Sequence, residues 1–165
     1  MKIITLTLNP AFDTHCALPT LALHHENFAA VTSTDAGGKG VNISRALTAN
    51  GVCNQAVVLT GAENQSSFLQ KLAEEGLEVS SISVAGRIRE NLTVHEGDGK
   101  ETRISFEGFT CSESVLEQVE AAAGAVDQKT IVTLTGSNPP GLSAEAVAPT
   151  APILSPARTV SPAET

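Results

Sequence analysis

A glycine-rich turn, GGKGVN at residues 37–42, decides the fold of this chain, because a helical pattern begins directly behind it. The pattern runs through about Asn50, and Gly51 is its stop signal. Glycines let a backbone approach a ligand closely, and free N–H groups at a helix start favour an anion. Lys39 adds a full positive charge. The stretch predicts an anion-binding turn, with an ordinary tight turn as the alternative.

The turn is not a Walker P-loop. That motif needs Ser or Thr directly after the lysine and a glycine five residues before the second one, but Gly40 and Ser33 stand at those positions.

Outward from this turn, strand and helix patterns alternate along the chain, which is typical of an α/β domain with a mostly parallel sheet. A capping pattern at Asn64 and another at Ser114 with Glu117 predict where two of the helices begin. The predicted core strands lie near residues 3–8, 53–59, 77–84 and 130–135, and the predicted helices near 40–50, 64–75 and 114–122.

Two segments do not fit the alternation. Residues 12–35 have no helical period, and the run from 89 to 106 contains a hairpin signal around Gly97-Asp98-Gly99. We expect both segments to form a small β lid that projects from the main sheet. The division we predict is one domain over 1–147 followed by an irregular, proline-rich tail over 148–165.

Composition excludes several classes of protein. With 41% hydrophobic and 17% charged residues, the chain is typical of a globular protein, and its formal charge of −8 argues against general binding to nucleic acid or to an anionic membrane. The three cysteines have no metal-ligand spacing, and no secretory leader is evident, so free thiols in a reducing cytoplasm are expected. The four histidines show no metal or triad spacing and receive no functional assignment.

Four motifs in order carry a resemblance to a known family. The chain resembles the phosphofructokinase-B branch of the ribokinase-like sugar kinases, and within it most closely the 1-phosphofructokinases. One departure is Ile88, which stands where the family usually has Thr. The motifs are TLNPAFD at 7–13, GGKGVN at 37–42, GRIREN at 86–91 and GSNPPG at 136–141.

The resemblance implies a ribokinase-like, Rossmann-type fold and a set of substrate-binding residues. This set consists of an acidic acceptor for sugar hydroxyls, backbone donors at the glycine turn and two arginines for the phosphate. Arginine suits phosphate because its guanidinium group is planar and donates several hydrogen bonds. For each, a structural or solvated side chain is the alternative. The residues are Asp13, Gly37, Gly38, Lys39, Asn42, Arg89, Arg103 and Ser137.

The family's catalytic base lies in a Gly-Ala-Gly-Asp motif after the Pro-Pro loop, and these 165 residues contain no such motif. GAVD at 124–127 is superficially similar but is expected at the end of a helix, where the dipole repels an anion. No catalytic residue and no metal ligand is therefore assigned, and the fold is expected to be truncated on its C-terminal side. The proline-rich segment 148–165 is either a natural flexible tail or the product of an interrupted reading frame.

The resemblance implies that the complete enzyme phosphorylates fructose 1-phosphate with ATP and Mg²⁺. Tagatose 6-phosphate and fructose 6-phosphate are the alternative substrates. Other interpretations are a non-catalytic phosphosugar-binding module and an inactive truncated product. The expected partners are a phosphorylated sugar and a second copy of the chain, paired through the β lid.

Overall fold

The computed structural model describes residues 1–147, so the tail expected over 148–165 lies outside the described residues. Its main body is a four-stranded sheet, ordered β5-β4-β1-β8, in which every neighbouring pair is parallel. Parallel strands of this kind are covered on both faces, so consecutive residues along them are buried. Most of β1 and β4 is buried. The strands are β1 (Lys2–Thr7), β4 (Gln55–Gly61), β5 (Val79–Val84) and β8 (Thr130–Leu134).

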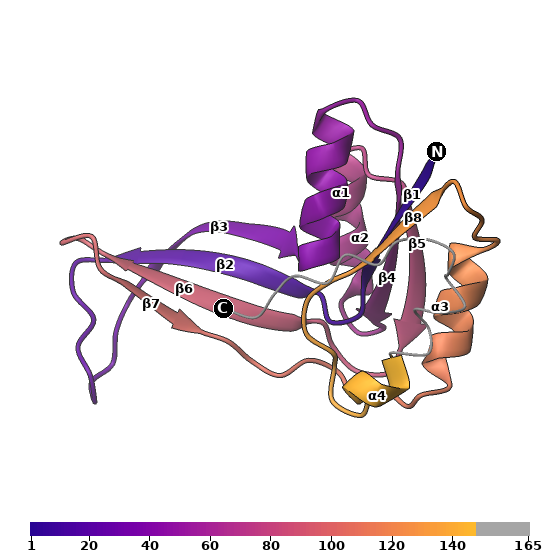
Figure 1. Cartoon of the computed structure of the whole chain (residues 1–165). Coiled ribbons are helices and arrows are strands. Elements are labelled where there is room, and N and C mark those ends of the chain that lie inside the picture. Colours follow the sequence, from indigo (N-terminus) through magenta and orange to yellow (C-terminus); the bar gives the residue numbers. More distant parts are fainter. Residues whose placement is uncertain (148–165) are drawn as a thin grey trace.

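Helices cover both faces of this sheet. Figure 1 shows α1 and α2 on one side and α3 on the other, an arrangement that follows from right-handed crossovers when the strand order reverses after β5. Each helix buries one stripe, as with Phe68 and Leu72 of α2 and Val115 and Val119 of α3. The helices are α1 (Lys39–Ala49), α2 (Gln65–Glu74), α3 (Val115–Ala123) and the short α4 (Ala144–Val147).

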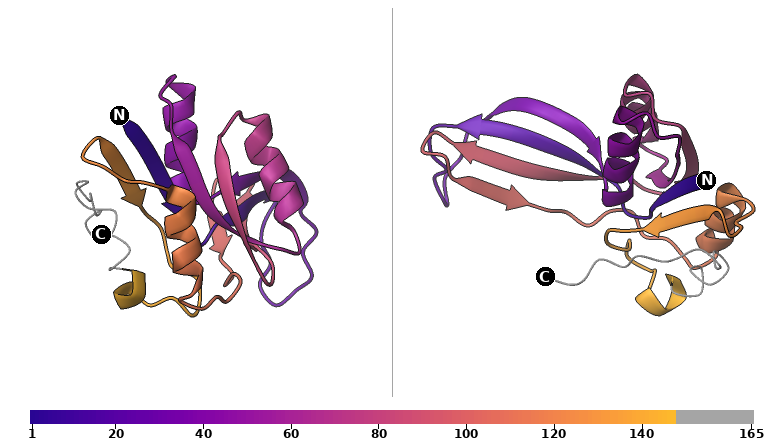
Figure 2. Two further views of the ribbon diagram at one scale, coloured as in Figure 1. Left: turned by 90° about the vertical axis from the view of Figure 1, so that its right-hand side faces the viewer. Right: turned by 45° about the horizontal axis from the view of Figure 1, so that its top comes forward.

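The segments from which a lid was expected form a second sheet, ordered β3-β2-β6-β7, which extends away from the body as an arm (Figures 1 and 2). We call this sheet the lid. Its central pair, β2 with β6, is parallel and runs in register over eight residues, whereas both outer pairs are antiparallel. The hairpin signal predicted only the β6–β7 pair. The strands are β2 (Ala11–Leu18), β3 (Ala30–Gly37), β6 (Arg89–Glu96) and β7 (Glu101–Ile104).

The register gives the lid two chemically different faces. Asp13 pairs with Asn91, and Thr93 pairs with Arg103, so these polar side chains share one face. The opposite face carries apolar cross-strand rows: Cys16 lies between Val31 and Val94, and Leu92 lies beside Ile104. The polar face therefore belongs to the candidate site described below.

The helices α2 and α3 begin directly after Asn64 and Ser114, as predicted, but neither side chain makes the predicted capping bond. Asn64 precedes α2 but makes no capping bond, and instead its side-chain amide receives a hydrogen bond from Ile88 N (2.8 Å) and donates to Ile88 O (3.0 Å). Ser114 precedes α3 in a helical conformation without a side-chain cap, so the capping box with Glu117 does not form. In the first case a tertiary contact, invisible to local pattern, takes the side chain.

No helix within residues 1–147 is long and apolar enough to cross a membrane.

Candidate functional site

A polar cavity of about 420 Å³ lies where the carboxyl ends of β1 and β8 meet the lid and the start of α1. Open α/β sheets bind ligands at this edge. A larger hollow of about 600 Å³, walled by Phe106 and Phe109, shares only Arg89 with it and lies beyond the ends of β4 and β5. The polar cavity is the better candidate because its mostly polar lining comes from five separate segments of the chain. The lining residues are Thr7, Asn9, Ala11, Asp13, Gly38, Lys39, Asn42, Arg89, Asn91, Arg103, Thr135, Gly136 and Ser137.

One part of the cavity presents hydrogen-bond acceptors. Asn91 Nδ2 donates to Asp13 Oδ1 at 3.0 Å, which orients the amide because a carboxylate only accepts. Asn91 Oδ1 consequently has no partner, although it is buried. Gly37 lies behind this pair, and a Cβ there would collide with the Asp13 carboxylate. This corner suits the hydroxyl groups of a sugar.

Three cations surround the same cavity. Arg89 Nη2 donates weakly to Asn9 O at 3.4 Å, and its buried Nε has no partner. Arg103 reaches the cavity from β7, and Lys39 from the first turn of α1. Among residues 1–147, none of the three lies in an ion pair with a carboxylate. Their uncompensated charge suits an anion such as phosphate.

The start of α1 packs tightly against β1, which explains its glycines. Gly38 has φ +138°, and a Cβ there would meet Thr7 Cγ2 at 2.6 Å. A Cβ on Gly40 would lie 2.6 Å from Leu6 O. Val41 N donates to Thr7 Oγ1 at 2.9 Å, and the helix has no side-chain cap. The first turn therefore presents its positive end at the cavity.

The loop after β8 closes the last side. Asn9 Nδ2 donates to Ser137 Oγ at 3.2 Å and to Asn138 O at 3.3 Å, tying this loop to the end of β1. Thr135 Oγ1 is buried and unpaired. Four buried side-chain atoms lack a partner in the described part of the chain, and all belong to residues lining this one cavity: Asn9 Oδ1, Arg89 Nε, Asn91 Oδ1 and Thr135 Oγ1.

The structure brings most of the residues selected from the sequence together. Gly37 does not line the cavity and instead makes room for Asp13. The sequence analysis did not assign Asn9, Asn91, Thr135 and Gly136, although three of them lie inside the quoted motifs. The selected residues that line the cavity are Asp13, Gly38, Lys39, Asn42, Arg89, Arg103 and Ser137.

Asp127 lies outside the cavity, in the turn between α3 and β8. Its Oδ1 accepts hydrogen bonds from Thr130 Oγ1 (2.7 Å) and Lys129 N (2.9 Å), and the Thr130 bond is the main reason that its pKa is lowered. This carboxylate stabilises a turn.

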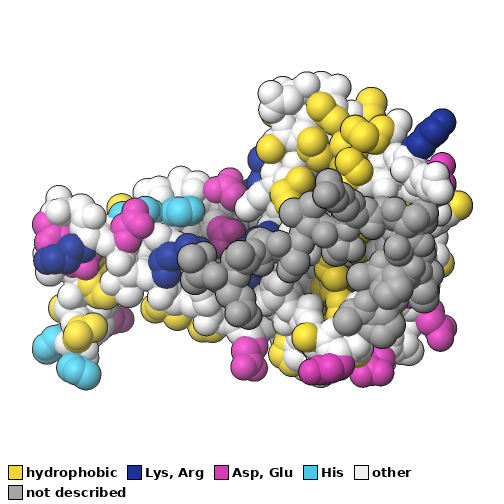
Figure 3. All heavy atoms as spheres, viewed as in Figure 1, with side chains coloured by type: hydrophobic (Ala, Val, Ile, Leu, Met, Phe, Trp, Pro, Cys, Tyr) yellow, Lys and Arg dark blue, Asp and Glu magenta, His cyan; other side chains and the backbone are white. Residues whose placement is uncertain are grey.

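The four histidines, which received no functional assignment from the sequence, all lie in the lid or in its connecting turn. His24 and His25 lie in the turn between β2 and β3. His15 Nδ1 lies 2.8 Å from His95 Nε2, and His95 Nδ1 lies 3.0 Å from Glu101 Oε1. Figure 3 shows histidine side chains along the lid and at its tip. In the described part of the chain, no three His, Cys, Asp or Glu side chains are grouped to hold a metal.

The cysteines are all free in the structure, and burial raises the pKa of the Cys111 thiol.

A parallel α/β sheet whose polar cavity lies under a projecting β lid defines the class of ribokinase-like kinases. The model of the pfkB family of carbohydrate kinases matches residues 25–159. The chain belongs to this family.

Related proteins agree with this assignment. The chain is 32% identical over 146 residues to a 1-phosphofructokinase of Escherichia coli strain K12 and 27% identical to an ATP-dependent 6-phosphofructokinase isozyme 2 of the same strain. Each alignment covers 88% of this chain but only 47% of the relative. This chain thus spans about half the length of these relatives.

Solved structures show the same partial coverage. A crystal structure of phosphofructokinase-2 from Escherichia coli in complex with fructose-6-phosphate superposes with a TM-score of 0.86 at 26% identity, covering 96% of this chain and 54% of that one. A tetrameric inhibited form of that protein gives a TM-score of 0.87 at 25% identity, covering 96% of this chain and 53% of that one.

Proposed function

We propose that this chain binds a phosphorylated sugar in the polar cavity and represents the substrate-binding part of a 1-phosphofructokinase-type kinase. The observation that carries the proposal is the convergence of acceptors at Asp13 and Asn91 with uncompensated cations at Lys39, Arg89 and Arg103. The four unpartnered buried atoms support it, because such atoms are costly without a ligand or water.

The proposed reaction of the complete enzyme transfers the γ-phosphoryl group of ATP, with Mg²⁺, to a hydroxyl of fructose 1-phosphate. The residues described here would hold the sugar hydroxyls and the existing phosphate, and thereby position the nucleophile. No group among them is assigned as the base, because the 165 residues lack a Gly-Ala-Gly-Asp motif.

The test is isothermal titration calorimetry of the full chain with fructose 1-phosphate, fructose 6-phosphate, tagatose 6-phosphate and unphosphorylated fructose. We expect heat of binding from the phosphosugars, with fructose 1-phosphate the tightest, and none from fructose. Equal binding of fructose, or no binding of any phosphosugar, would refute the proposal.

A second candidate function is a phosphosugar-binding module without catalysis. The cavity supports it equally, because the residues described there account for the binding of a phosphosugar and not for phosphoryl transfer. A coupled assay of ADP release distinguishes the two: the module predicts ligand-induced thermal stabilisation without ADP, whereas the kinase predicts ADP that depends on the phosphosugar.

We also propose that two copies pair through the apolar face of the lid. Val31 is 65% exposed and Ile104 is 44% exposed on that face, and exposed apolar side chains of this kind mark interaction surfaces. Multi-angle light scattering should give a dimer for the native chain and a monomer for Val31→Lys. Ser33→Lys, on the same strand but on the polar face, is the matched control and should remain dimeric.

A further inference from the structure

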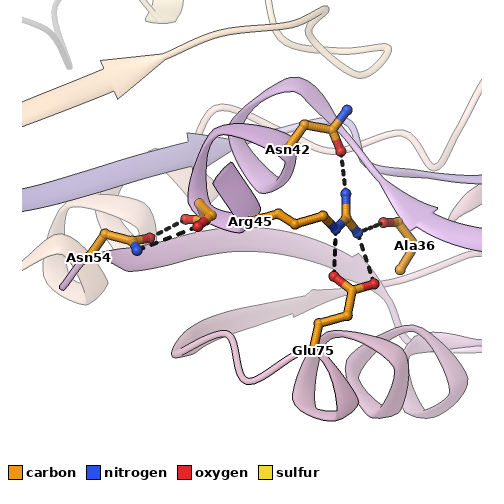
Figure 4. Close-up of polar contacts among 6 residues, drawn as sticks. Ala36, Asn42, Arg45, Asn54 and Glu75 are labelled. Carbon is orange, nitrogen blue, oxygen red and sulfur yellow. Dashed lines mark hydrogen bonds and ion pairs between the residues drawn. The ribbon is translucent and has the colours of Figure 1, made fainter. Parts of the chain in front are cut away.

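Arg45 makes an unusually complete set of contacts next to the polar cavity. Its Nη1 donates to Asn42 Oδ1 at 2.6 Å, and its Nη2 donates to Ala36 O at 2.7 Å. Nε and Nη2 also bind the two carboxylate oxygens of Glu75, at 2.6 and 3.1 Å. Figure 4 shows the guanidinium at the centre of these partners.

These contacts connect three separate elements. Arg45 and Asn42 lie three residues apart on α1, Ala36 lies in β3 directly before the glycine turn, and Glu75 is the C-cap of α2. Glu75 compensates the charge of Arg45, so Arg45 does not act as a fourth cation of the cavity. Its role is to hold neighbouring groups in place.

The chemistry of the guanidinium fixes the orientation of the Asn42 amide. Arginine has donors only, so the Asn42 atom that faces it must be the carbonyl oxygen. The Nδ2 group then lies on the side away from Arg45, as Figure 4 shows. Because Asn42 lines the polar cavity, this group is available there as a donor.

We propose that Arg45 is a positioning residue: it orients Asn42 as an obligate hydrogen-bond donor and, through Ala36, anchors the strand that leads into the glycine turn. The inference rests on the proposed function and deepens it. The ligand group received at Asn42 is an acceptor, either a phosphate oxygen or the lone pair of a sugar hydroxyl. Arg45 itself contacts no ligand.

Substitutions of Asn42 test the direction of the hydrogen bond. Asn42→Ala removes the donor and should weaken fructose 1-phosphate binding by about tenfold. In Asn42→Asp, Arg45 binds one carboxylate oxygen and the other takes the place of Nδ2. A negatively charged oxygen of the protein then faces the acceptor group of the ligand and repels it. We expect a loss of at least about a hundredfold in calorimetry with unchanged or higher thermal stability. Binding by Asn42→Asp that equals or exceeds that of Asn42→Ala would overturn the proposal.

Substitutions of Arg45 test the positioning itself. Arg45→Lys keeps the charge but cannot serve Asn42, Ala36 and Glu75 together, so the affinity for fructose 1-phosphate should fall by about tenfold. The control Glu75→Gln removes the ion pair and leaves the bond to Asn42, and it should retain affinity within about twofold. Equal affinity losses in Arg45→Lys and Glu75→Gln would mean that Arg45 has only a structural role.

Nuclear magnetic resonance without ligand separates this inference from the proposed function. The two Nδ2 protons of Asn42 are assigned by their loss in Asn42→Ala. In Arg45→Lys, their chemical shifts should move toward those of a solvent-exposed asparagine side chain that has no fixed hydrogen-bond partner. They should stay in place in Glu75→Gln. If the native chain binds no phosphosugar, the proposed function fails, but these shifts still decide the positioning role, and unchanged shifts in Arg45→Lys overturn it.

Discussion

At the residue scale, the cavity combines acceptors that suit sugar hydroxyls with cations that suit phosphate. Single substitutions should affect the binding of one kind of group without the other. Arg103→Gln removes a charged donor, and charge-assisted hydrogen bonds contribute about 1.5–3 kcal/mol. Because Arg103 is exposed, we expect the lower part of this range, roughly a tenfold loss of affinity. The loss should appear in titrations with both fructose 1-phosphate and inorganic phosphate.

Asp13→Asn complements Arg103→Gln, because it alters an acceptor for sugar hydroxyls and not a donor for phosphate. It should weaken fructose 1-phosphate binding by a similar factor, because a hydroxyl donates better to a carboxylate than to an amide. Inorganic phosphate should bind equally well or better, since a negative charge has been removed from the cavity. Loss of phosphate binding in Asp13→Asn would contradict the division of roles.

Asp127 gives a prediction with a defined pH dependence. Its folded pKa lies below the unfolded value of 3.8, because the ionised carboxylate accepts bonds from Thr130 and Lys129. Its stabilising effect is therefore complete above that value and is lost as the pH falls through the folded pKa. Asp127→Asn should lower the thermal midpoint at pH 7, and the difference from the native chain should shrink below pH 3.8. It should leave phosphosugar binding unchanged, which calorimetry checks.

At the element scale, the sequence predicted what local pattern determines. The helices α1 and α2 begin and end within a residue or two of the prediction, because glycines and an apolar stripe mark them. Asn64 was assigned as a cap, yet its partner is Ile88, twenty-four residues away. The eight-residue parallel register of β2 with β6 was not predicted either, since long-range strand pairing leaves no local signal.

Gly40 tests how closely α1 must approach β1. Gly40→Ala improves helix propensity by about 1 kcal/mol. The added Cβ would nevertheless meet Leu6 O at 2.6 Å, a backbone atom in a buried strand that has little room to move. Overpacking of this kind costs about 1–3 kcal/mol, so we expect a net loss of stability in urea titrations. Unchanged or higher stability would show that α1 can shift outward freely.

At the scale of the whole molecule, four motifs predicted the cavity better than any single residue did. These motifs are far apart in the sequence, but each contributes residues to the lining of the same cavity. They are the glycine turn, the end of the first strand, the arginine segment and the Pro-Pro loop. Asn9 and Asn91 were missed because their chemistry depends on partners from other segments, Ser137 and Asp13. The His15–His95 contact was missed for the same reason.

In the part of the chain that the structure describes, the main sheet ends in two edge strands, β5 and β8, each with a single neighbour. Within residues 1–147, β8 pairs only with β1, so its other edge presents unpaired backbone groups, and Ile131 on this strand is 36% exposed. Open edges of this kind promote association between chains. We therefore expect the purified chain to associate with rising concentration, measured as light scattering over time.

A charge on β8 should suppress this association, because edge lysines prevent strands of two molecules from pairing. Ile131→Lys should slow the rise in scattering several-fold while changing stability by no more than about 0.5 kcal/mol, as is usual for surface substitutions. Val52→Lys is the matched control, because Val52 is 37% exposed but lies between α1 and β4. If the rise in scattering slows equally in both variants, net charge and not the β8 edge governs association. If it slows in Ile131→Lys alone, the chains associate through β8.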